Sequence, residues 1–416
     1  MAGGWAKRIA LVIVALLAFA VGFAGAAAGL DMTQPAVRGS TARVQFEVLR
    51  GDDTAAVAAR LQREGLIRNA LVFRALARLR HLDTHIEAGI YDLSPSMSTA
   101  AVVARLVTGR ASQRTITVPE GLRVTQYPRY FAVLPHFDAA RFLKTAASGQ
   151  LPDGTRLWEA YWYVPKPDAG VPYTLEGYLF PDTYAFDPTA DDSAVVRRML
   201  DTLGERLCPG PDAAHLDAYL HDAAQCKAHE ARLGASGPGL FERLEDRYFT
   251  SDDAAALRDA LILGSLAIRE IAKPTDAPGV VNVFYNRYLV AAGKLPASDD
   301  HPGYLGSDPS AEYARDTLQP PADGHWWAEL ADAGAKTAPA SPYNADVTTQ
   351  LGLIPGPIAA PGWAELAAAA NPNADGPTTA FFFVTDHCGT PHYAATLSAF
   401  QADAQRAVDQ KQCWTT

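Results

Sequence analysis

Glu270 is the residue whose type and position point most directly to acid–base chemistry. The apolar pattern around it predicts a helix that Ser251 or Asp252 caps and that Pro274 must end. Glu270 then lies in the last turn, where the negative end of the helix dipole and partial burial both disfavour a carboxylate, so we expect a raised pKa. A glutamic acid that is protonated near neutral pH can act as a general acid. A solvated glutamate paired with Arg269 or Lys273 is the alternative.

Aromatic side chains interleaved with prolines mark the stretch between Pro152 and Pro172. It holds Trp158, Trp162 and neighbouring tyrosines, and it leads on to Glu176. Flat sugar rings stack on such side chains, while carboxylates accept hydrogen bonds from sugar hydroxyls. A packed turn, which aromatic residues also fill, explains the same pattern, and the sequence leaves both interpretations open.

The cysteines favour disulfides over a metal site. Sequence alone leaves three connectivities open, and pairs that close short loops are favoured. These pairs are Cys208 with Cys226 and Cys388 with Cys413. The spacing of His387, Cys388 and His392 matches no CxxC framework. We therefore expect no metal, and nothing in the sequence indicates an organic cofactor.

The composition indicates a folded protein that does not bind nucleic acid. A chain of 416 residues with 48% hydrophobic content has room for two or three domains with ample cores. The formal net charge is -10, and there is no long run of lysine or arginine. Because phosphate binding needs a basic surface, we expect no nucleic-acid partner. Neutral sugars remain compatible with this charge.

The N-terminal segment predicts a membrane anchor. No charged residue occurs from Ile9 to Leu30, a run that at about 1.5 Å per residue spans a bilayer core of about 30 Å. Lys7 and Arg8 precede the run and Asp31 follows it, so the positive-inside bias predicts a cytoplasmic N-terminus and an extracytoplasmic remainder. A cleaved signal peptide is the alternative, although the apolar run exceeds the usual length of its hydrophobic region.

A small module is expected next. Val44, Phe46 and Val48 alternate with polar residues as a half-buried strand does. Two helices follow, and 88–93 predicts a returning strand before Ser98 caps a third helix. The order strand, helix, helix, strand resembles the LysM-like module that binds peptidoglycan in bacterial wall proteins. A small spacer domain is the alternative, because fold does not imply function.

Motifs spread over the rest of the chain carry a longer resemblance. They are Val118-Pro119-Glu120-Gly121, Glu176-Gly177-Tyr178 through Pro181-Asp182-Thr183-Tyr184, Leu263-Gly264-Ser265-Leu266-Ala267-Ile268-Arg269-Glu270, Val283-Phe284-Tyr285-Asn286-Arg287, Ser307-Asp308-Pro309, Ser341-Pro342-Tyr343-Asn344, Gly352 to Ala359, and Phe383-Val384 with His392-Tyr393. In this order they resemble the MltG (YceG-like) family of endolytic murein transglycosylases. The membrane anchor and the LysM-like module stand in the family order as well.

The resemblance implies cleavage of the bond between N-acetylmuramic acid and N-acetylglucosamine in nascent glycan strands, with a 1,6-anhydro end as product. One carboxyl, that of Glu270, would act first as general acid and then as base. The resemblance also implies peptidoglycan strands as the partner and suggests the cell-wall synthesis machinery. A hydrolytic muramidase that uses the same glutamate with water is an alternative.

One departure from the family bears on activity. The family helix usually reads Glu-Lys/Arg-Glu, where this chain has Ile268-Arg269-Glu270. Residues two apart on a helix point about 200° apart, so the two acids cannot share one role. We assign catalysis to Glu270. A catalytically silent wall-binding relative is the alternative if the essential acid is the one that Ile268 replaces.

The expected fold is α+β: an N-terminal transmembrane helix, a small LysM-like βααβ module and a larger mixed α+β catalytic domain. The expected divisions are 1–32 for the cytoplasmic tip and transmembrane anchor, 33–43 for a spacer, 44–112 for the LysM-like module and 113–416 for the catalytic domain, with an inserted segment at about 207–250. Amides and acids at loop ends can orient sugars by directed hydrogen bonds. The candidate substrate-binding residues are Glu176, Asn286, Ser307, Asp308, Tyr343 and Asn344.

Overall fold

The protein is described from a computed structural model of the chain. The structure describes residues 29, 32–49, 51–80, 86, 89–108, 113–208, 216–232, 240–297, 300–301, 303–330, 340–345, 351–371 and 379–410. Contacts divide the chain into two compact units, the first mainly 1–115 and the second mainly 116–416, with 134–136 and 185–190 grouped with the first. Among the residues described, no helix is long and apolar enough to cross a membrane. The predicted anchor at 9–30 lies almost wholly outside them.

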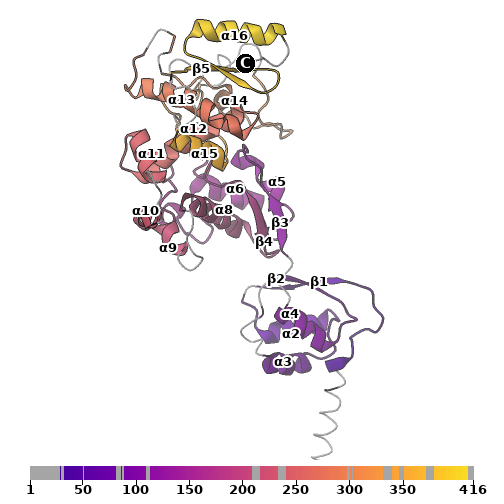
Figure 1. Ribbon diagram of the computed structural model, residues 1–416. Coiled ribbons are helices and arrows are strands. Elements are labelled where there is room, and N and C mark those ends of the chain that lie inside the picture. Colours follow the sequence, from indigo (N-terminus) through magenta and orange to yellow (C-terminus); the bar gives the residue numbers. More distant parts are fainter. Residues whose placement is uncertain are drawn as a thin grey trace, which may run out of the picture. The chain divides into compact units, whose positions relative to one another are not determined.

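The first unit has the element order that the sequence predicts. Its elements are β1 (Val44–Val48), α2 (Thr54–Arg63), α3 (Ala70–Leu79), β2 (Gly89–Leu93) and α4 (Thr99–Thr108). Strands β1 and β2 are antiparallel, with Phe46 opposite Tyr91, and the three helices lie on one side of this pair (Figure 1). Asp53 and Asn69 cap α2 and α3 through their side chains. Phe46 and Tyr91 pack with Phe73 in the core of this unit.

The second unit begins with short elements around one two-stranded sheet. They are β3 (Arg114–Thr117), a 3-10 helix (Val124–Gln126), α5 (Pro128–Phe131), α6 (Ala139–Ser148), α7 (Leu157–Ala160), β4 (Thr183–Phe186) and α8 (Asp192–Leu207). Strands β3 and β4 pair. The segment that the sequence marks as an insertion follows as α9 (Leu216–His221), α10 (Ala223–Arg232) and α11 (Leu240–Tyr248). A disulfide between Cys208 and Cys226 confirms the predicted pairing there.

The remaining elements surround one long helix. They are α12 (Asp253–Glu270), a 3-10 helix (Pro274–Asp276), α13 (Ala277–Ala291), α14 (Asp308–Leu318), α15 (Trp363–Ala370), β5 (Phe382–Thr385), β6 (Pro391–Ala394) and α16 (Leu397–Gln410). Helix α12 packs against α11, α13, α14 and α15. Strands β5 and β6 form an antiparallel pair, with Phe383 opposite Tyr393, and α16 packs against both. The mixed α+β class is therefore confirmed.

Candidate active site

Glu270 is the last residue of the central helix. Asp252 caps α12 by accepting a hydrogen bond from the amide of Ala255 at 3.1 Å, as the sequence predicts. Nearly every side chain from Ala256 to Ala267 is buried, which is typical of a helix that is apolar all round and enclosed by others. The final turn is less enclosed, and Glu270 there is half-buried. The helix core therefore holds the one carboxyl of that turn in place.

Ser307 is the hydrogen-bond partner of this carboxyl. Its hydroxyl donates to Oε1 of Glu270 at 3.2 Å. Ser307 is the N-cap residue of α14, yet its side chain makes no capping hydrogen bond, and it is only 1% exposed. The preceding loop is held by Arg287 of α13, which donates to the carbonyl oxygen of Gly306 at 3.0 Å and, through Nε, to that of Phe381 at 2.7 Å. Helix α13 thus fixes the donor that faces Glu270.

Burial raises the pKa of Glu270 to about 7, from an ordinary value of 4.5. The hydrogen bond from Ser307 lowers it, the carboxylate of Asp308 raises it, the guanidinium of Arg287 lowers it and the carboxyl of Glu312 raises it. A carboxyl with this pKa is substantially protonated near neutral pH, so it can donate a proton and later take one back. The sequence predicts the direction of this shift.

Glu312 is a second carboxyl at this site, and sequence reasoning missed it. It lies one helical turn after Asp308 on α14 and is 8% exposed. Burial raises its pKa to about 7, while Arg315 and Arg269 lower it. Within the part of the chain that the structure describes, no hydrogen bond or ion pair holds its carboxyl. The available signal was its position four residues after Asp308, which puts both acids on one face of a helix.

Arg269, the neighbour of Glu270 in the chain, stacks on an aromatic side chain. Its guanidinium carbon lies 4.3 Å from the ring centroid of Trp327. Trp327 has a φ of 67°, a left-handed conformation that a bulky residue adopts only when its surroundings enforce it. Its amide donates to Asp316 at 2.9 Å, and its indole donates to Gln126 at 3.3 Å. The segment after α14 therefore places Trp327 against Arg269, a contact that the sequence did not reveal.

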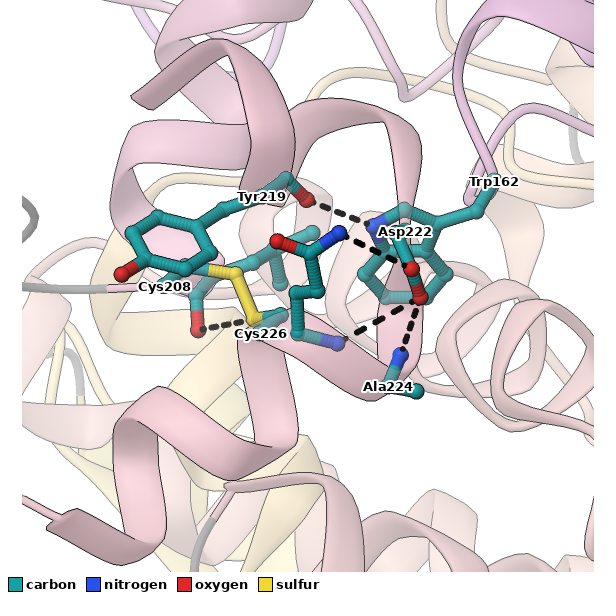
Figure 2. Close-up of a disulfide and its surroundings, with 8 residues drawn as sticks. Trp162, Cys208, Tyr219, Asp222, Ala224 and Cys226 are labelled. Carbon is teal, nitrogen blue, oxygen red and sulfur yellow. Dashed lines mark hydrogen bonds between the residues drawn. A yellow bond between two sulfur atoms is a disulfide. The ribbon is translucent and has the colours of Figure 1, made fainter. Parts of the chain in front are cut away.

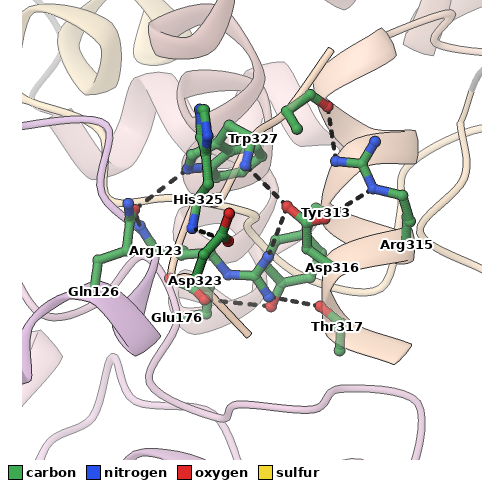
Figure 3. A network of polar contacts seen from close by, with 11 residues as sticks. Arg123, Gln126, Glu176, Tyr313, Arg315, Asp316, Thr317, Asp323, His325 and Trp327 are labelled. Atoms are coloured by element: carbon green, nitrogen blue, oxygen red, sulfur yellow. Dashed lines mark hydrogen bonds and ion pairs between the residues drawn. The ribbon is translucent and has the colours of Figure 1, made fainter. Parts of the chain in front are cut away.

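Arg123 is the centre of the polar network that includes Trp327 (Figure 3). It is fully buried, and its guanidinium lies 4.4 Å from the ring centroid of Tyr313 and 4.3 Å from that of Trp326. It donates to the hydroxyl of Thr317 at 2.7 Å and lies 3.9 Å from Asp316. These contacts fasten the Val118-Pro119-Glu120-Gly121 turn and the segment beyond it to α14.

Ile268 faces a different element from Glu270. A Cβ placed on Gly121 would lie 3.4 Å from its side chain, and Gly121 has a φ of 75°, which favours glycine. Ile268 therefore packs toward this turn, while Glu270 faces Ser307. The opposite orientation of the two positions follows from helix geometry, as the sequence predicts.

Besides Ser307, four of the six predicted substrate-binding side chains are buried. Glu176 is 2% exposed and accepts hydrogen bonds from the amide of Val124 at 2.8 Å and the hydroxyl of Tyr313 at 3.3 Å. Burial raises its pKa to about 8, opposed by Arg123. With both oxygens engaged, Glu176 joins two segments of the fold and is not free to contact a ligand.

The other three are Asn286, Tyr343 and Asn344, at 2%, 3% and 2% exposed. Asn286 belongs to α13 and not to a loop end, and its amide donates to the carbonyl oxygen of Ala380 at 2.8 Å. Tyr343 packs on the ring of Tyr313. Ser307 and Asp308 do gather at Glu270, with Asp308 exposed in the first turn of α14.

The histidines near the C-terminal strands contact a carboxylate and a backbone carbonyl oxygen. His392 lies 3.2 Å from Asp386, and the ring of His387 contacts the carbonyl oxygen of Ala407. Cys388 is disulfide-bonded, whereas Cys413, its predicted partner, lies outside the described residues, so that pairing stays a prediction. No cluster of three or more potential metal ligands occurs among the residues that the structure describes.

The chain is similar to proteins of one family over most of its length. Residues 46–406 match the model of the YceG-like family. An endolytic murein transglycosylase of Streptococcus pneumoniae (strain D39) is 26% identical over 364 residues, covering 84% of this chain and 56% of the relative. The chain thus spans little more than half the length of this relative.

The Bacillus subtilis (strain 168) protein of the same name is 23% identical over 391 residues, covering 92% of this chain and 90% of the relative. A crystal structure of a yceG-like protein from Listeria monocytogenes is 22% identical, with a TM-score of 0.46, and covers 87% of this chain and 99% of that one.

Proposed function

We propose that this chain, which belongs to the YceG-like family, is a lytic transglycosylase that cleaves peptidoglycan glycan strands internally. The relatives named endolytic murein transglycosylase support this activity. The observation that carries it is the half-buried Glu270, whose pKa of about 7 suits a group that gives and takes a proton in one cycle.

Glu270 supplies both proton transfers. Its carboxyl donates a proton to the oxygen that links N-acetylmuramic acid to N-acetylglucosamine, and that bond breaks as positive charge develops on the muramic C1. The C6 hydroxyl of the same sugar then attacks C1. Its proton passes to the Glu270 carboxylate, which restores the acid. The products are a 1,6-anhydro end and a free hydroxyl on the neighbouring sugar, and no water is consumed.

Ser307 and the neighbouring acids affect the balance between the protonated and ionised forms of Glu270. The hydroxyl of Ser307 stabilises the carboxylate that forms after the first transfer. Glu312 and Asp308 oppose that charge and favour the protonated form before it. The site therefore has groups that balance the two states of Glu270.

Glu312 supports hydrolysis as a second candidate function. Most glycoside hydrolases use two carboxyls, one as acid and the other as nucleophile or as base for a water molecule. Glu312 is a second buried carboxyl, and it interacts electrostatically with Glu270. If it activated water, the product would carry a reducing end in place of the anhydro end.

The test compares the full chain with Glu270→Gln and Glu312→Gln variants on uncrosslinked glycan strands in water enriched in oxygen-18. Anhydro ends from the wild type and from Glu312→Gln, with none from Glu270→Gln, are the expected result. Glu312→Gln is the matched control, because it removes a neighbouring buried carboxyl by the same substitution. Mass spectrometry identifies the ends.

Two outcomes would point elsewhere. Reducing ends that carry oxygen-18, lost in Glu312→Gln, would assign the protein as a hydrolase. Binding without cleavage by the wild type, together with cleavage by an Ile268→Glu variant, would assign it as a silent relative whose essential acid is at position 268.

We also propose that the chain is a single-pass membrane protein with its active site outside the cytoplasm. The uncharged run at 9–30 supports an anchor. The βααβ order of the first unit supports a LysM-like module that holds glycan, and the family suggests the cell-wall synthesis machinery as a further partner. Both roles suit an enzyme that works on newly made strands.

A further inference from the structure

A cavity of about 540 Å³ lies in the second unit, beside the first two turns of α12. Its walls come from 158–178, from the start of α12 and from the loop at 355–357. Glu270, Ser307 and Glu312 are not among its lining residues. The cavity is therefore separate from the acidic site, although one helix joins the two.

The walls combine aromatic faces with balanced charge. Trp158, Trp162 and Tyr173 line the cavity and are half-buried. Lys166 and Arg258 supply positive charge to the walls, and two aspartates supply negative charge. Arg258 is already bonded to Asp259, at 3.0 and 2.8 Å. Such a lining has no net charge to select an ionic ligand, whereas flat rings with a few polar groups suit a neutral one.

One of two buried tyrosine hydroxyls points to a ligand that forms hydrogen bonds. Tyr178 lines the cavity and is 1% exposed. The hydroxyl of Tyr343 lies next to Gly356 of the cavity wall, 3.0 Å from where a Cβ on that glycine would be. In the described part of the chain neither hydroxyl has a hydrogen-bond partner. Buried polar groups are nearly always paired, so the hydroxyl of Tyr178, which lines the cavity, indicates an acceptor or donor supplied from within it.

The inserted segment fixes one of the aromatic walls (Figure 2). The indole of Trp162 donates to the carbonyl oxygen of Tyr219 on α9 at 3.2 Å. The disulfide between Cys208 and Cys226 joins the end of α8 to α10, on either side of α9. The insertion therefore has a role in this cavity: it sets the orientation of the Trp162 ring.

Distance along α12 relates the cavity to the acidic site. Arg258 lies 12 residues before Glu270 on the same helix, or about 18 Å at 1.5 Å per residue. One ligand can reach both only if it is an extended polymer of several units. A glycan strand has this form, and its N-acetylglucosamine rings have flat faces, hydroxyls and no charge.

We propose that this cavity is a distal subsite that binds N-acetylhexosamine rings of the glycan strand, stacked on Trp158 and Trp162 and hydrogen-bonded by Tyr178. The choice of ligand rests on the proposed function. A stem peptide fits less well, because its several charges would need unpaired partners, and Arg258 is already neutralised by Asp259. Binding at both places would select long strands over short fragments.

The test measures the affinity of the full chain, kept in mild detergent, for chitotetraose, an uncharged N-acetylglucosamine oligomer without peptide. Tyr178→Phe removes only the hydroxyl, and we expect an affinity loss of about three- to tenfold, the usual range for one hydrogen bond. Its Tm should not fall, because that hydroxyl has no partner to lose. Trp162→Ala should abolish binding. Calorimetric titration measures both effects.

Tyr163→Phe is the matched control. Its hydroxyl is buried and donates to the carbonyl oxygen of Leu200 at 2.8 Å, and it does not line the cavity. This variant should lower Tm by a few degrees and leave the affinity for chitotetraose within about twofold. Opposite effects of two similar substitutions would separate ligand binding from stability.

Three results would overturn the inference. The first is that Tyr178→Phe binds chitotetraose as tightly as the wild type, and the second is that only Glu270→Gln weakens this binding. The third is that a free stem peptide, and not chitotetraose, binds in a way that depends on Tyr178. The failure of the proposed function would look different. Tyr178-dependent binding of chitotetraose without any strand cleavage would refute the cleavage activity and leave the subsite standing.

Discussion

At the scale of single residues, the site depends on the balance of groups around one carboxyl. Burial favours the neutral form of Glu270, Asp308 and Glu312 reinforce that preference, and Ser307 and Arg287 oppose it. The result is a pKa of about 7. In the proposed reaction the carboxyl is protonated at the start, so the rate of cleavage should fall as pH rises through that value.

Replacing Ser307 with alanine should shift the pH at which the cleavage rate falls. The Ser307 hydroxyl lowers the pKa of Glu270, so its loss raises that pKa, and the fall in rate shifts upward by about half a unit to one unit. Initial cleavage rates between pH 5 and 9 measure the shift. Ser148→Ala is the control, because that hydroxyl bonds only within its own turn. If the rate falls at the same pH in Ser307→Ala and in the wild type, the role of Ser307 is contradicted.

Glu176→Gln should change how stability depends on pH. Burial raises the pKa of Glu176 to about 8 in the folded protein, from 4.5. Between these values the unfolded chain has released the proton and the folded one has kept it, so rising pH favours unfolding. The stabilisation is complete below about 4.5 and lost as pH rises through about 8, and each unit of pKa corresponds to about 1.4 kcal/mol.

Glutamine retains an acceptor for Val124 but does not titrate, so Tm of this variant should fall less than that of the wild type between pH 5 and 8. Thermal unfolding at a series of pH values measures the difference. Glu159→Gln, at a side chain that is 60% exposed, should follow the wild-type curve. Parallel curves for wild type and Glu176→Gln would show that Glu176 ionises normally.

At the scale of elements, α12 connects the proposed subsite to the proposed catalytic acid. Its N-terminal turns line the cavity, its middle is buried, and its last residue is Glu270. Ser265, in the middle, accepts a hydrogen bond from the amide of Ile358 at 3.1 Å, which brings the loop at 355–357 against the helix. Gly177 allows this loop to approach, since a Cβ there would lie 2.5 Å from Pro357.

Opening the disulfide with Cys208→Ser and Cys226→Ser should loosen the wall of the cavity. The bond closes a loop with a sequence separation of 18, for which the chain-entropy model gives a stabilisation of about 3 kcal/mol. We expect a lower Tm and weaker binding of chitotetraose, because Tyr219 would hold Trp162 less firmly. Thermal unfolding and titration measure these effects.

The control is Cys388→Ser, which opens a disulfide in another part of the chain. It should leave the affinity for chitotetraose unchanged, whatever its effect on Tm. Unchanged affinity in the double Cys208, Cys226 variant would instead show that α9 orients Trp162 without help from the disulfide.

At the scale of the whole molecule, the chain consists of two units, and the proposed anchor lies at the start of the first. We expect the protein to remain in the membrane pellet after an alkaline carbonate wash, and protease added to spheroplasts should digest it beyond residue 32. A variant that lacks 1–32 should be recovered in the soluble fraction. Recovery of the intact chain in that fraction would contradict an anchor, and a new N-terminus near 28 would indicate a cleaved signal peptide.

The sequence alone predicted features that depend on residues close together in the chain. Capping residues, proline and apolar periodicity predicted where α12 begins and ends and therefore that Glu270 lies in its last turn. Loop length predicted the Cys208 to Cys226 bond, and alternation predicted β1 and β2. Each of these features depends on residues close together in the chain, where hydrogen bonds and side-chain spacing follow directly from the order of amino acids.

Only the tertiary structure decided which polar residues surround Glu270. Glu176 and Asn286 stand in motifs as prominent as that of Ser307, yet the fold bonds them to Val124 and Ala380, while it brings the unremarked Glu312 and Trp327 to the site. The hydrogen bond from Arg123 to Thr317 joins residues 194 positions apart. Burial and electrostatic shifts depend on such distant contacts, which no local pattern encodes, so the sequence determined the acid and the fold determined its surroundings.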